Sequence, residues 1–583
     1  MVVIASVSHF SWAVDGSIVG LYLLATMVAG LMMRRYIGKV DDFLIAGREV
    51  NVYLGIASLA ATEFGIITCM YTAQAGYLNG FSGAIPGLCQ CIAMFVIGVT
   101  GFCIKPLRES GAVTIPELFE RRFGKFIRWL AGVVIVLGGL LNMGVFLKIG
   151  GDFLVIVTNI STGTIDLGFI TLTNLQFIMA LLLIAVATYT ILGGMLSVLV
   201  TDFLQFIVMS VGLIVVTVLI LKEVGFNNLV DTVQANVGAG GFNPLANKGL
   251  GWPFLIFQIL IQTAATLTWQ TSIARVLASK DQKTGRKIYT GTSFFFVARF
   301  LIPGMWGMAA LWMLSQPAHR SDLLDLRRTE LAAIEQRGDA VARSMTAEEK
   351  TLVVERSRDL VAELGAKKES ERTAGEKSVL AVATKVEQEV SLHAMPKFLS
   401  LFVPLGLMGL LIAAMLAADM STDSSYMLTW GSVIYNDITA PFRKTKWSEK
   451  KGILANRMIV ALIGVYLLLF GLFYEIKGNV WDYLTLTGSI YLSSMSVLLI
   501  ACCYWKRANN WGALGGIIIG AVVPVLYLTS QKVPSLMHLA EQIGPYYSGI
   551  AAYVGAALGM IIGSLLKTAV LPEPAKNGNG GAR

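Results

Sequence analysis

The chain has 583 residues, of which 55% are hydrophobic and only 14% charged, and its mean hydropathy is +0.67. Apolar blocks of about 20 residues, the length of a membrane-spanning helix, recur along it. This composition excludes a soluble enzyme, and the continuous blocks exclude an outer-membrane barrel, whose strands alternate in polarity. The formal net charge of +9 does not indicate nucleic-acid binding, because in a membrane protein the basic residues mostly mark which side of the membrane a loop faces.

The apolar blocks predict an all-α polytopic membrane protein. The N-terminal sequence MVVIASVSHFSWAVDGS lacks the basic region of a cleaved signal peptide, so we expect the first span to be retained. About thirteen spans are predicted, near residues 16–33, 52–79, 82–104, 127–158, 171–193, 196–221, 253–274, 289–315, 398–436, 454–474, 481–504, 511–529 and 547–566.

The loops between these spans differ in charge. Alternate loops are rich in Lys and Arg, as in RRYIGK and RVLASKDQKTGRK, whereas short loops such as TNISTGTIDLG are nearly free of them. The positive-inside rule therefore predicts an extracellular N-terminus and a cytoplasmic C-terminus in a plasma or inner membrane. An odd number of spans agrees with this orientation.

Residues 316–395 form a charged insert with 13 Lys and Arg and 15 Asp and Glu. Thr346 and Glu349 have the spacing of a capping box and predict a helix from this point. The insert falls on the outer side, where long loops translocate regardless of charge. It is interpreted as an amphipathic helical hairpin or partly disordered loop, or else as a domain that binds an unknown partner.

Cysteine and histidine do not indicate catalysis or transition-metal binding. The six cysteines form no CxxC pair, and the four histidines are far apart and lie outside the spans. No nucleophile, base and orienting group converge by sequence, so we expect no enzyme.

The spans contain ionisable residues that must be explained. A charged side chain at the membrane centre costs roughly 2.5–3.5 kcal/mol, so it needs a partner, a cavity or a function. Glu63 and Arg299 are predicted near the midplane, at the level of Gln262 and Thr266. Structural ion pairing is the alternative for each of these residues.

The stretch AADMSTDSSYM, residues 417–427, has two polar faces when placed on a helix. The hydroxyl groups, which suit a small hard cation, occupy one side. Asp419 and Asp423 lie nearly opposite and are expected to meet cytoplasm or a basic residue such as Arg275 or Arg457.

Over residues 16 to about 530 the chain resembles the sodium:solute symporter (SSS) family, whose members carry sugars, proline, sialic acid, pantothenate, choline or anions. The resemblance rests on five stretches: DDFLIAGREV (41–50), SLAATEFGIITCMYTAQAGYLNG (58–80), TIPELFERRFGK (114–125), LGGMLSVLVTDFLQ (192–205) and LIAAMLAADMSTDSSYMLTWGSVIYND (411–437).

The resemblance implies a LeuT-like core of two five-helix inverted repeats, each beginning with a helix that is broken at mid-membrane. Glycines flank the candidate break in the first repeat, whereas the Thr-rich break in the second lacks an obvious Gly or Pro. The expected organisation is an N-terminal part (1–51), repeat 1 (52–221), an extracellular loop (222–252), repeat 2 (253–504) interrupted by the insert (316–395), two peripheral helices (505–566) and a cytoplasmic tail (567–583).

The resemblance also implies sodium as a co-transported ion. The main sodium site would take the backbone carbonyls of Ala61, Phe64 and Ala418 and the hydroxyls of Ser421 and Thr422. A second sodium site, present in some members, would take Asp202, Ser421, Ser424 and Ser425.

The solute site implied by the resemblance comprises Glu63, Thr68, Gln90, Gln262, Thr266, Arg299 and Thr485. Arg299 could hold a carboxylate in bidentate fashion, or it could be neutralised by Glu63, leaving a pocket for a neutral or zwitterionic solute. Residues 264–266 read AAT where sugar carriers have a Tyr-Tyr-Trp gate, so a carboxylate is favoured over a sugar.

The sequence thus predicts sodium-coupled symport of a small polar organic solute by alternating access. Two alternatives remain open. One is a transporter-like receptor that senses its solute, and the other is a proton-coupled carrier that uses Glu63.

Overall fold

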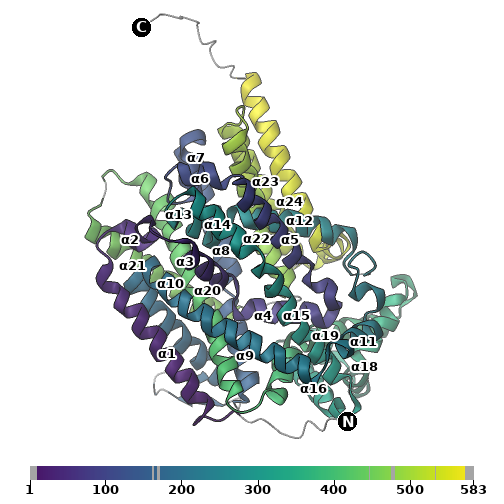
Figure 1. Cartoon of the computed structure of the whole chain (residues 1–583). Coiled ribbons are helices and arrows are strands. Elements are labelled where there is room, and N and C mark those ends of the chain that lie inside the picture. Colours follow the sequence, from purple (N-terminus) through teal and green to yellow (C-terminus); the bar gives the residue numbers. More distant parts are fainter. Residues whose placement is uncertain are drawn as a thin grey trace, which may run out of the picture.

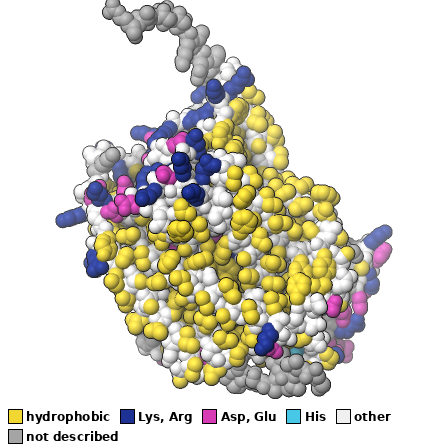
Figure 2. All heavy atoms as spheres, in the orientation of Figure 1, with side chains coloured by type: hydrophobic (Ala, Val, Ile, Leu, Met, Phe, Trp, Pro, Cys, Tyr) yellow, Lys and Arg dark blue, Asp and Glu magenta, His cyan; other side chains and the backbone are white. Residues whose placement is uncertain are grey.

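A computed structural model describes residues 10–160, 163–166, 168, 171–247, 249–445, 447–474, 480–531 and 533–570. The first nine residues and most of the predicted cytoplasmic tail, 571–583, lie outside these described residues. The described chain is a helical bundle (Figure 1). Figure 2 shows hydrophobic side chains over the middle of the face in view, with charged side chains gathered toward two ends, as expected for a protein embedded in lipid.

Eleven helical stretches in the described residues are long and apolar enough to cross a membrane. This number agrees with about thirteen predicted spans, because two of the stretches each hold two of them. One stretch is Ile66–Thr100, and the other is the 50-residue helix α10 (Asn174–Glu223). Gly194 interrupts α10 with a φ of 51°, between the two spans predicted there.

The helices before residue 224 form the first set. They are α1 (Asp15–Met32), α2 (Val40–Ile45), α3 (Val52–Glu63), α4 (Ile66–Asn79), α5 (Ile85–Thr100), α6 (Ile104–Glu109), α7 (Ile115–Phe123), α8 (Lys125–Met143), α9 (Phe146–Thr158) and α10. A short antiparallel hairpin, β1 (Thr164–Asp166) and β2 (Thr171–Thr173), precedes α10 and pairs Thr164 with Thr173.

The later membrane helices form the second set and the periphery. They are α12 (Gly251–Thr268), α13 (Gln270–Ala278), α14 (Gln282–Ser293), α15 (Phe295–Leu314), α20 (Leu407–Val433), α21 (Glu449–Phe473), α22 (Val480–Tyr504), α23 (Asn510–Ser530) and α24 (Pro534–Val570). Helix α11 (Phe226–Asn236) lies between the two sets.

Each set contains a helix that is broken, as predicted for the first helix of each repeat. Helix α3 ends at Glu63 and α4 begins at Ile66, with Phe64 in a non-helical conformation. In the second set the break is the single residue Trp269, whose ψ of 116° separates α12 from α13. The second break therefore forms without a glycine or a proline.

The charged insert is helical. It comprises α16 (Arg320–Gln336), α17 (Ala340–Ser344), α18 (Ala347–Ala366) and the first part of α19 (Ala374–Phe402), and Thr346 and Glu349 form the predicted capping box. A buried ion pair of 2.8 Å between Arg327 and Glu387 joins α16 to α19. Figure 1 places α16 and α18 at the end of the molecule opposite α6 and α7.

The predicted span 398–436 requires a correction. Helix α19 continues from the insert to Phe402, and α20 begins only at Leu407. Pro404 and Gly406, the latter with a φ of 83°, separate the two helices. The sequence is apolar on both sides of this interruption, so hydropathy alone predicted one continuous span.

Helix α20 lies at the centre of the bundle. Nearly every residue from Met408 to Val433 is buried, and the helix packs against α10, α1 and α3. A helix that is buried on all faces can keep polar side chains away from lipid. Its hydroxyl-rich segment is thereby held beside the first helix break.

Candidate functional site

The break between α3 and α4 is in direct contact with α20. A Cβ added to Gly65 would lie 2.9 Å from Thr422 Oγ1, so only glycine allows this approach without displacing Thr422. The Ala61 carbonyl accepts from the Phe64 N–H at 3.2 Å, whereas the Thr62 carbonyl has no backbone partner among the described residues. Helix α20 supplies hydroxyl groups to both carbonyls.

These carbonyls and hydroxyls form a cluster of oxygen atoms from two helices. Ser421 Oγ lies 2.9 Å from both the Ala61 and the Ala418 carbonyl oxygens. Thr422 Oγ1 lies 3.0 Å from the Thr62 and Ala418 carbonyl oxygens. The set consists of neutral hard oxygen atoms, the ligand type that alkali and alkaline-earth cations prefer.

The cluster contains four of the five groups predicted for the main sodium site. Among the described residues no hydrogen bond joins the Phe64 carbonyl to it, whereas the Thr62 carbonyl belongs to it and was not predicted. Thr62 is in the last turn of α3, where carbonyls lack helical partners, and this end effect is the signal that could have identified it.

The residues predicted for the second sodium site surround an arginine. Asp202 Oδ2 lies 3.0 Å from Arg275 Nη2, and both side chains are completely buried. Ser425 Oγ accepts from the same nitrogen at 2.5 Å. The hydroxyls of Ser421 and Ser424 are directed to backbone carbonyls instead.

Asp419 and Asp423 lie away from the oxygen cluster, as the helical projection predicts. Asp419 is against Gly150 of α9, where an added Cβ would be 3.2 Å from Asp419 Oδ1. The expected contact with cytoplasm is wrong, because both aspartates are buried. The expected pairing with Arg275 or Arg457 is also wrong, because Arg275 binds Asp202 and Arg457 donates to the Leu192 carbonyl. Neither aspartate has a hydrogen bond or ion pair among the described residues.

A pocket with an empty volume of about 690 Å³, including the space at its mouth, lies beside the break. Six of the seven predicted solute residues line it: Glu63, Thr68, Gln90, Gln262, Arg299 and Thr485. Thr62 and Thr422, which belong to the oxygen cluster, line it as well.

Thr266 is not among the residues that line the pocket. It is completely buried, its hydroxyl donates to the Gln262 carbonyl, and its own carbonyl accepts from Tyr289. The sequence analysis also missed the aromatic walls of the pocket, which come from helices far apart in the chain: Tyr71, Phe146, Trp269, Phe300, Tyr426 and Trp481. Of these six residues, only Trp269 has a position in the sequence, at the second helix break, that could have indicated a place in the pocket wall.

Arg299 and Glu63 face each other in the pocket. Arg299 Nη1 lies 3.4 Å from Glu63 Oε2 and 3.4 Å from Gln90 Oε1, while Nη2 lies 3.2 Å from the Tyr71 hydroxyl. These distances are at the long end of the hydrogen-bond range. Glu63 Oε1 is held more closely, at 2.7 Å from Ser272 Oγ and 3.1 Å from Thr271 Oγ1.

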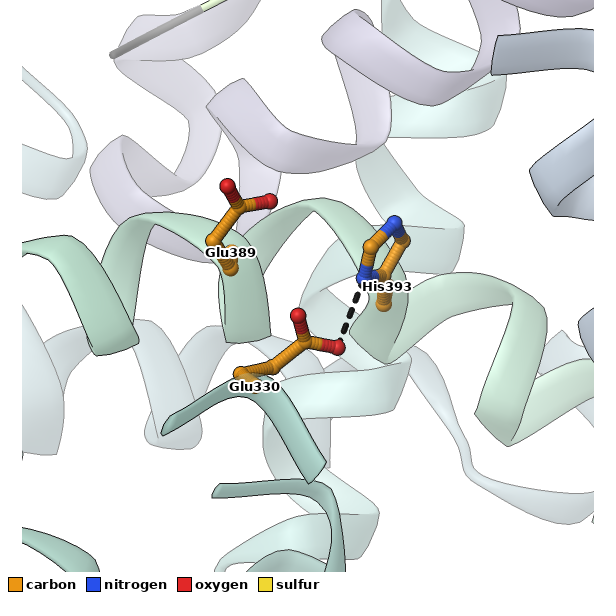
Figure 3. A group of neighbouring side chains, drawn as sticks. All are labelled: Glu330, Glu389 and His393. Carbon is orange, nitrogen blue, oxygen red and sulfur yellow. Dashed lines mark hydrogen bonds and ion pairs between the residues drawn. The ribbon is translucent and has the colours of Figure 1, made fainter. Parts of the chain in front are cut away.

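A second group of ionisable residues lies in the insert and is drawn in Figure 3: Glu330, Glu389 and His393. Their ligand atoms lie within 4.8 Å of one another, as a metal site would require. Each residue already has a charged partner, however: His393 Nδ1 is 2.8 Å from Glu330 Oε1, and Glu389 is 2.6 Å from Arg337. We interpret the group as ion pairs that join α16 to α19.

This chain is similar to known transporters. The family model described as the sodium:solute symporter family matches residues 43–316 and 371–520. The rabbit (Oryctolagus cuniculus) sodium/glucose cotransporter 1 is 25% identical over 551 residues, which cover 89% of this chain and 72% of that protein. The osmoregulated proline transporter OpuE of Bacillus subtilis (strain 168) is 22% identical over 96% of this chain and 95% of its own.

A solved structure supports the fold. The substrate-bound outward-open state of a Na⁺-coupled sialic acid symporter superimposes with a TM-score of 0.69 at 17% identity, over 95% of this chain and 97% of that one. The predicted LeuT-like architecture is therefore confirmed at the level of the fold.

Gly65→Ala tests the packing of the break. The added Cβ would displace Thr422, and such overpacking costs about 1–3 kcal/mol. We expect a lower melting temperature of the purified protein in Gly65→Ala, but not in Gly20→Ala, because nothing lies within 4 Å of a Cβ at Gly20. Equal melting temperatures of the two variants would contradict the close approach.

The pair of His393 and Glu330 should make stability depend on pH. Burial of the ring opposes its charge, but Glu330, with Asp152 and Glu389, raises the pKa of His393 from 6.5 to about 9. Because the folded pKa is the higher one, this stabilisation is complete below pH 6.5 and is lost as the pH rises through about 9.

His393→Gln removes the charge but keeps a hydrogen-bond donor. We expect it to destabilise the protein by about 1 kcal/mol at low pH, the difference between a charged and a neutral hydrogen bond. Melting temperatures of the two proteins should converge above pH 9 or so. A difference that stays constant across this range would refute the ion pair.

Proposed function

Because the chain belongs to the sodium:solute symporter family, we propose that it takes up a small polar organic solute together with sodium by alternating access. One observation carries the proposal: the oxygen cluster and the pocket share residues. Thr422 contributes its hydroxyl to the cluster and also lines the pocket, and Thr62 does the same with its carbonyl. A cation in the cluster would therefore fix the pocket wall that the solute touches.

The proposed cycle uses the interface between the α3–α4 break and α20. Sodium binding from outside would hold the two elements together and complete the pocket, and inward opening would separate them and release the ion. The membrane potential supplies ~2.3 kcal/mol per charge at 100 mV, so one sodium ion supports about fifty-fold accumulation.

The proposed orientation places the N-terminus outside, the C-terminus in the cytoplasm and the insert on the extracellular side of a cell membrane. The basic connections support it. The insert helices α16 and α18 also lie opposite α6 and α7 (Figure 1), which carry the basic residues Arg108, Arg121 and Arg122. Within this scheme the two repeats occupy residues 52–221 and 253–504.

We assign a carboxylate-bearing solute to the pocket. Arg299 is held by long hydrogen bonds, and its Nε is buried without a partner among the described residues. A carboxylate that offers two oxygens to the guanidinium would replace these long bonds with short charge-assisted ones. Glu63 keeps hydrogen bonds from two hydroxyl groups, which still stabilise its carboxylate when Arg299 turns to the solute.

Ser421→Ala and Thr422→Ala test the sodium site. Each removes one hydroxyl ligand, and we expect at least about a ten-fold rise in the sodium concentration that gives half-maximal uptake, equivalent to ~1.4 kcal/mol. Uptake by reconstituted protein is measured against sodium concentration. Ser432→Ala is the matched control, because its hydroxyl lies on the same helix and, among the described residues, bonds to the Thr429 carbonyl alone.

Unchanged sodium dependence in both Ser421→Ala and Thr422→Ala would contradict the site. Uptake that follows pH without sodium would favour a proton-coupled carrier instead.

Arg299→Gln tests the solute class. We expect it to weaken binding of carboxylate solutes by about 100-fold, which corresponds to a lost charge-assisted pair of ~3 kcal/mol, and to affect the matching neutral amides much less. Thermal stabilisation of the purified protein by each solute pair provides the measurement. Equal losses for acids and amides would show that Arg299 is a structural partner of Glu63.

A further inference from the structure

The position of the predicted second sodium site contains a side chain that carries its own positive charge. Arg275 lies on α13, just beyond the break at Trp269, and is completely buried. Its guanidinium reaches Asp202 on α10, Ser425 on α20, and Ser58 and Thr62 on α3. It thus connects the first broken helix, the second broken helix and α20.

The guanidinium uses the oxygen atoms that a sodium ion would need. Its Nη2 lies 3.0 Å from Asp202 Oδ2, 2.5 Å from Ser425 Oγ and 2.6 Å from Thr62 Oγ1. The other nitrogens are bonded too: Nε donates to Ser58 Oγ and Nη1 to the Thr271 carbonyl, both at 3.1 Å.

The remaining members of the predicted second set leave too few ligands. The Ser421 hydroxyl faces the Ala61 and Ala418 carbonyls, and the Ser424 hydroxyl lies 3.3 Å from the Ser421 carbonyl. Asp202 Oδ1 alone is buried without a hydrogen-bond partner among the described residues. The Ser421 hydroxyl belongs to the main site, and a donating hydroxyl keeps its lone pairs, so the Ser424 oxygen is available beside Asp202 Oδ1. Two oxygens are insufficient for a hard cation, which takes several.

Charge balance gives the same result. Asp202 and Arg275 neutralise each other in a site with no exposure to solvent. A sodium ion added there would place a net positive charge in the core, where an uncompensated charge is strongly disfavoured. The residues present therefore do not fit a second sodium ion.

We propose that the guanidinium of Arg275 takes the place of the second sodium ion, so that this protein binds sodium at the main site only. The proposal specifies the coupling ratio of the function proposed above and rests on it. Because the arginine is covalently attached, the charge at Asp202 stays with the protein through the transport cycle. Each solute molecule is then accompanied by a single sodium ion.

Sodium binding to purified protein tests the proposal without requiring transport. The number of ²²Na⁺ ions bound per protein is measured at saturation for the wild type, Arg275→Gln and the double variant Asp202→Asn/Arg275→Gln. Arg457→Gln is the matched control. It also removes an arginine from the bundle, but the Arg457 guanidinium donates to the Leu192 backbone carbonyl rather than to a carboxylate.

We expect Arg275→Gln to bind one more sodium ion per protein than the wild type, because the unpaired Asp202 then requires a cation. The double variant and Arg457→Gln should bind the same number as the wild type. The double variant has no unpaired charge, so it is expected to fold even where Arg275→Gln does not.

Two results would overturn the proposal: no additional sodium ion in folded Arg275→Gln, or one fewer in the double variant than in the wild type. Failure of the proposed function gives a different result, namely no sodium in the wild type. In that case, one sodium ion bound to Arg275→Gln would still support the inference that Arg275 takes the place of a sodium ion beside Asp202.

Discussion

The structure depends on how the break between α3 and α4 is stabilised inside the membrane. A helix interrupted there leaves the Thr62 carbonyl without a backbone partner among the described residues, and lipid offers none. Ser421 and Thr422 of α20 supply hydroxyls to the Ala61 and Thr62 carbonyls, and Gly65 permits the close approach. The same contact that satisfies the backbone also gathers the oxygen atoms suited to a small cation.

The proposed coupling between sodium and solute would follow from contacts that the cluster, the pocket and the arginine share. The cluster, the pocket and the buried arginine share one interface, because Thr62 touches all three. Any rearrangement that parts α3 from α20 would open the cation cluster and the solute pocket together. Arg275 adds a fixed charge that is carried by α13 and bonded to α3, α10 and α20.

The fold and most of the site follow from the sequence, because their signals are local or shared with relatives. Long apolar blocks predict spans, and periodicity separates the hydroxyl face of α20 from Asp419 and Asp423. What the sequence does not indicate is which distant residues meet. Arg275 binds Asp202 rather than the aspartates of α20 that the sequence analysis paired with it. Six aromatic side chains from separate helices line the pocket. Thr266 has the right depth in the membrane but lies outside the pocket lining, since depth does not determine the direction of a side chain.

Solute accumulation in proteoliposomes is the most direct measurement of the central claim, that the energy of a sodium gradient drives solute through this interface. An inward sodium gradient should concentrate the solute above its outside level, and equal sodium on both sides should allow only equilibration. Accumulation that persists without a sodium gradient, or solute that binds with sodium but never reaches the lumen, would contradict the account.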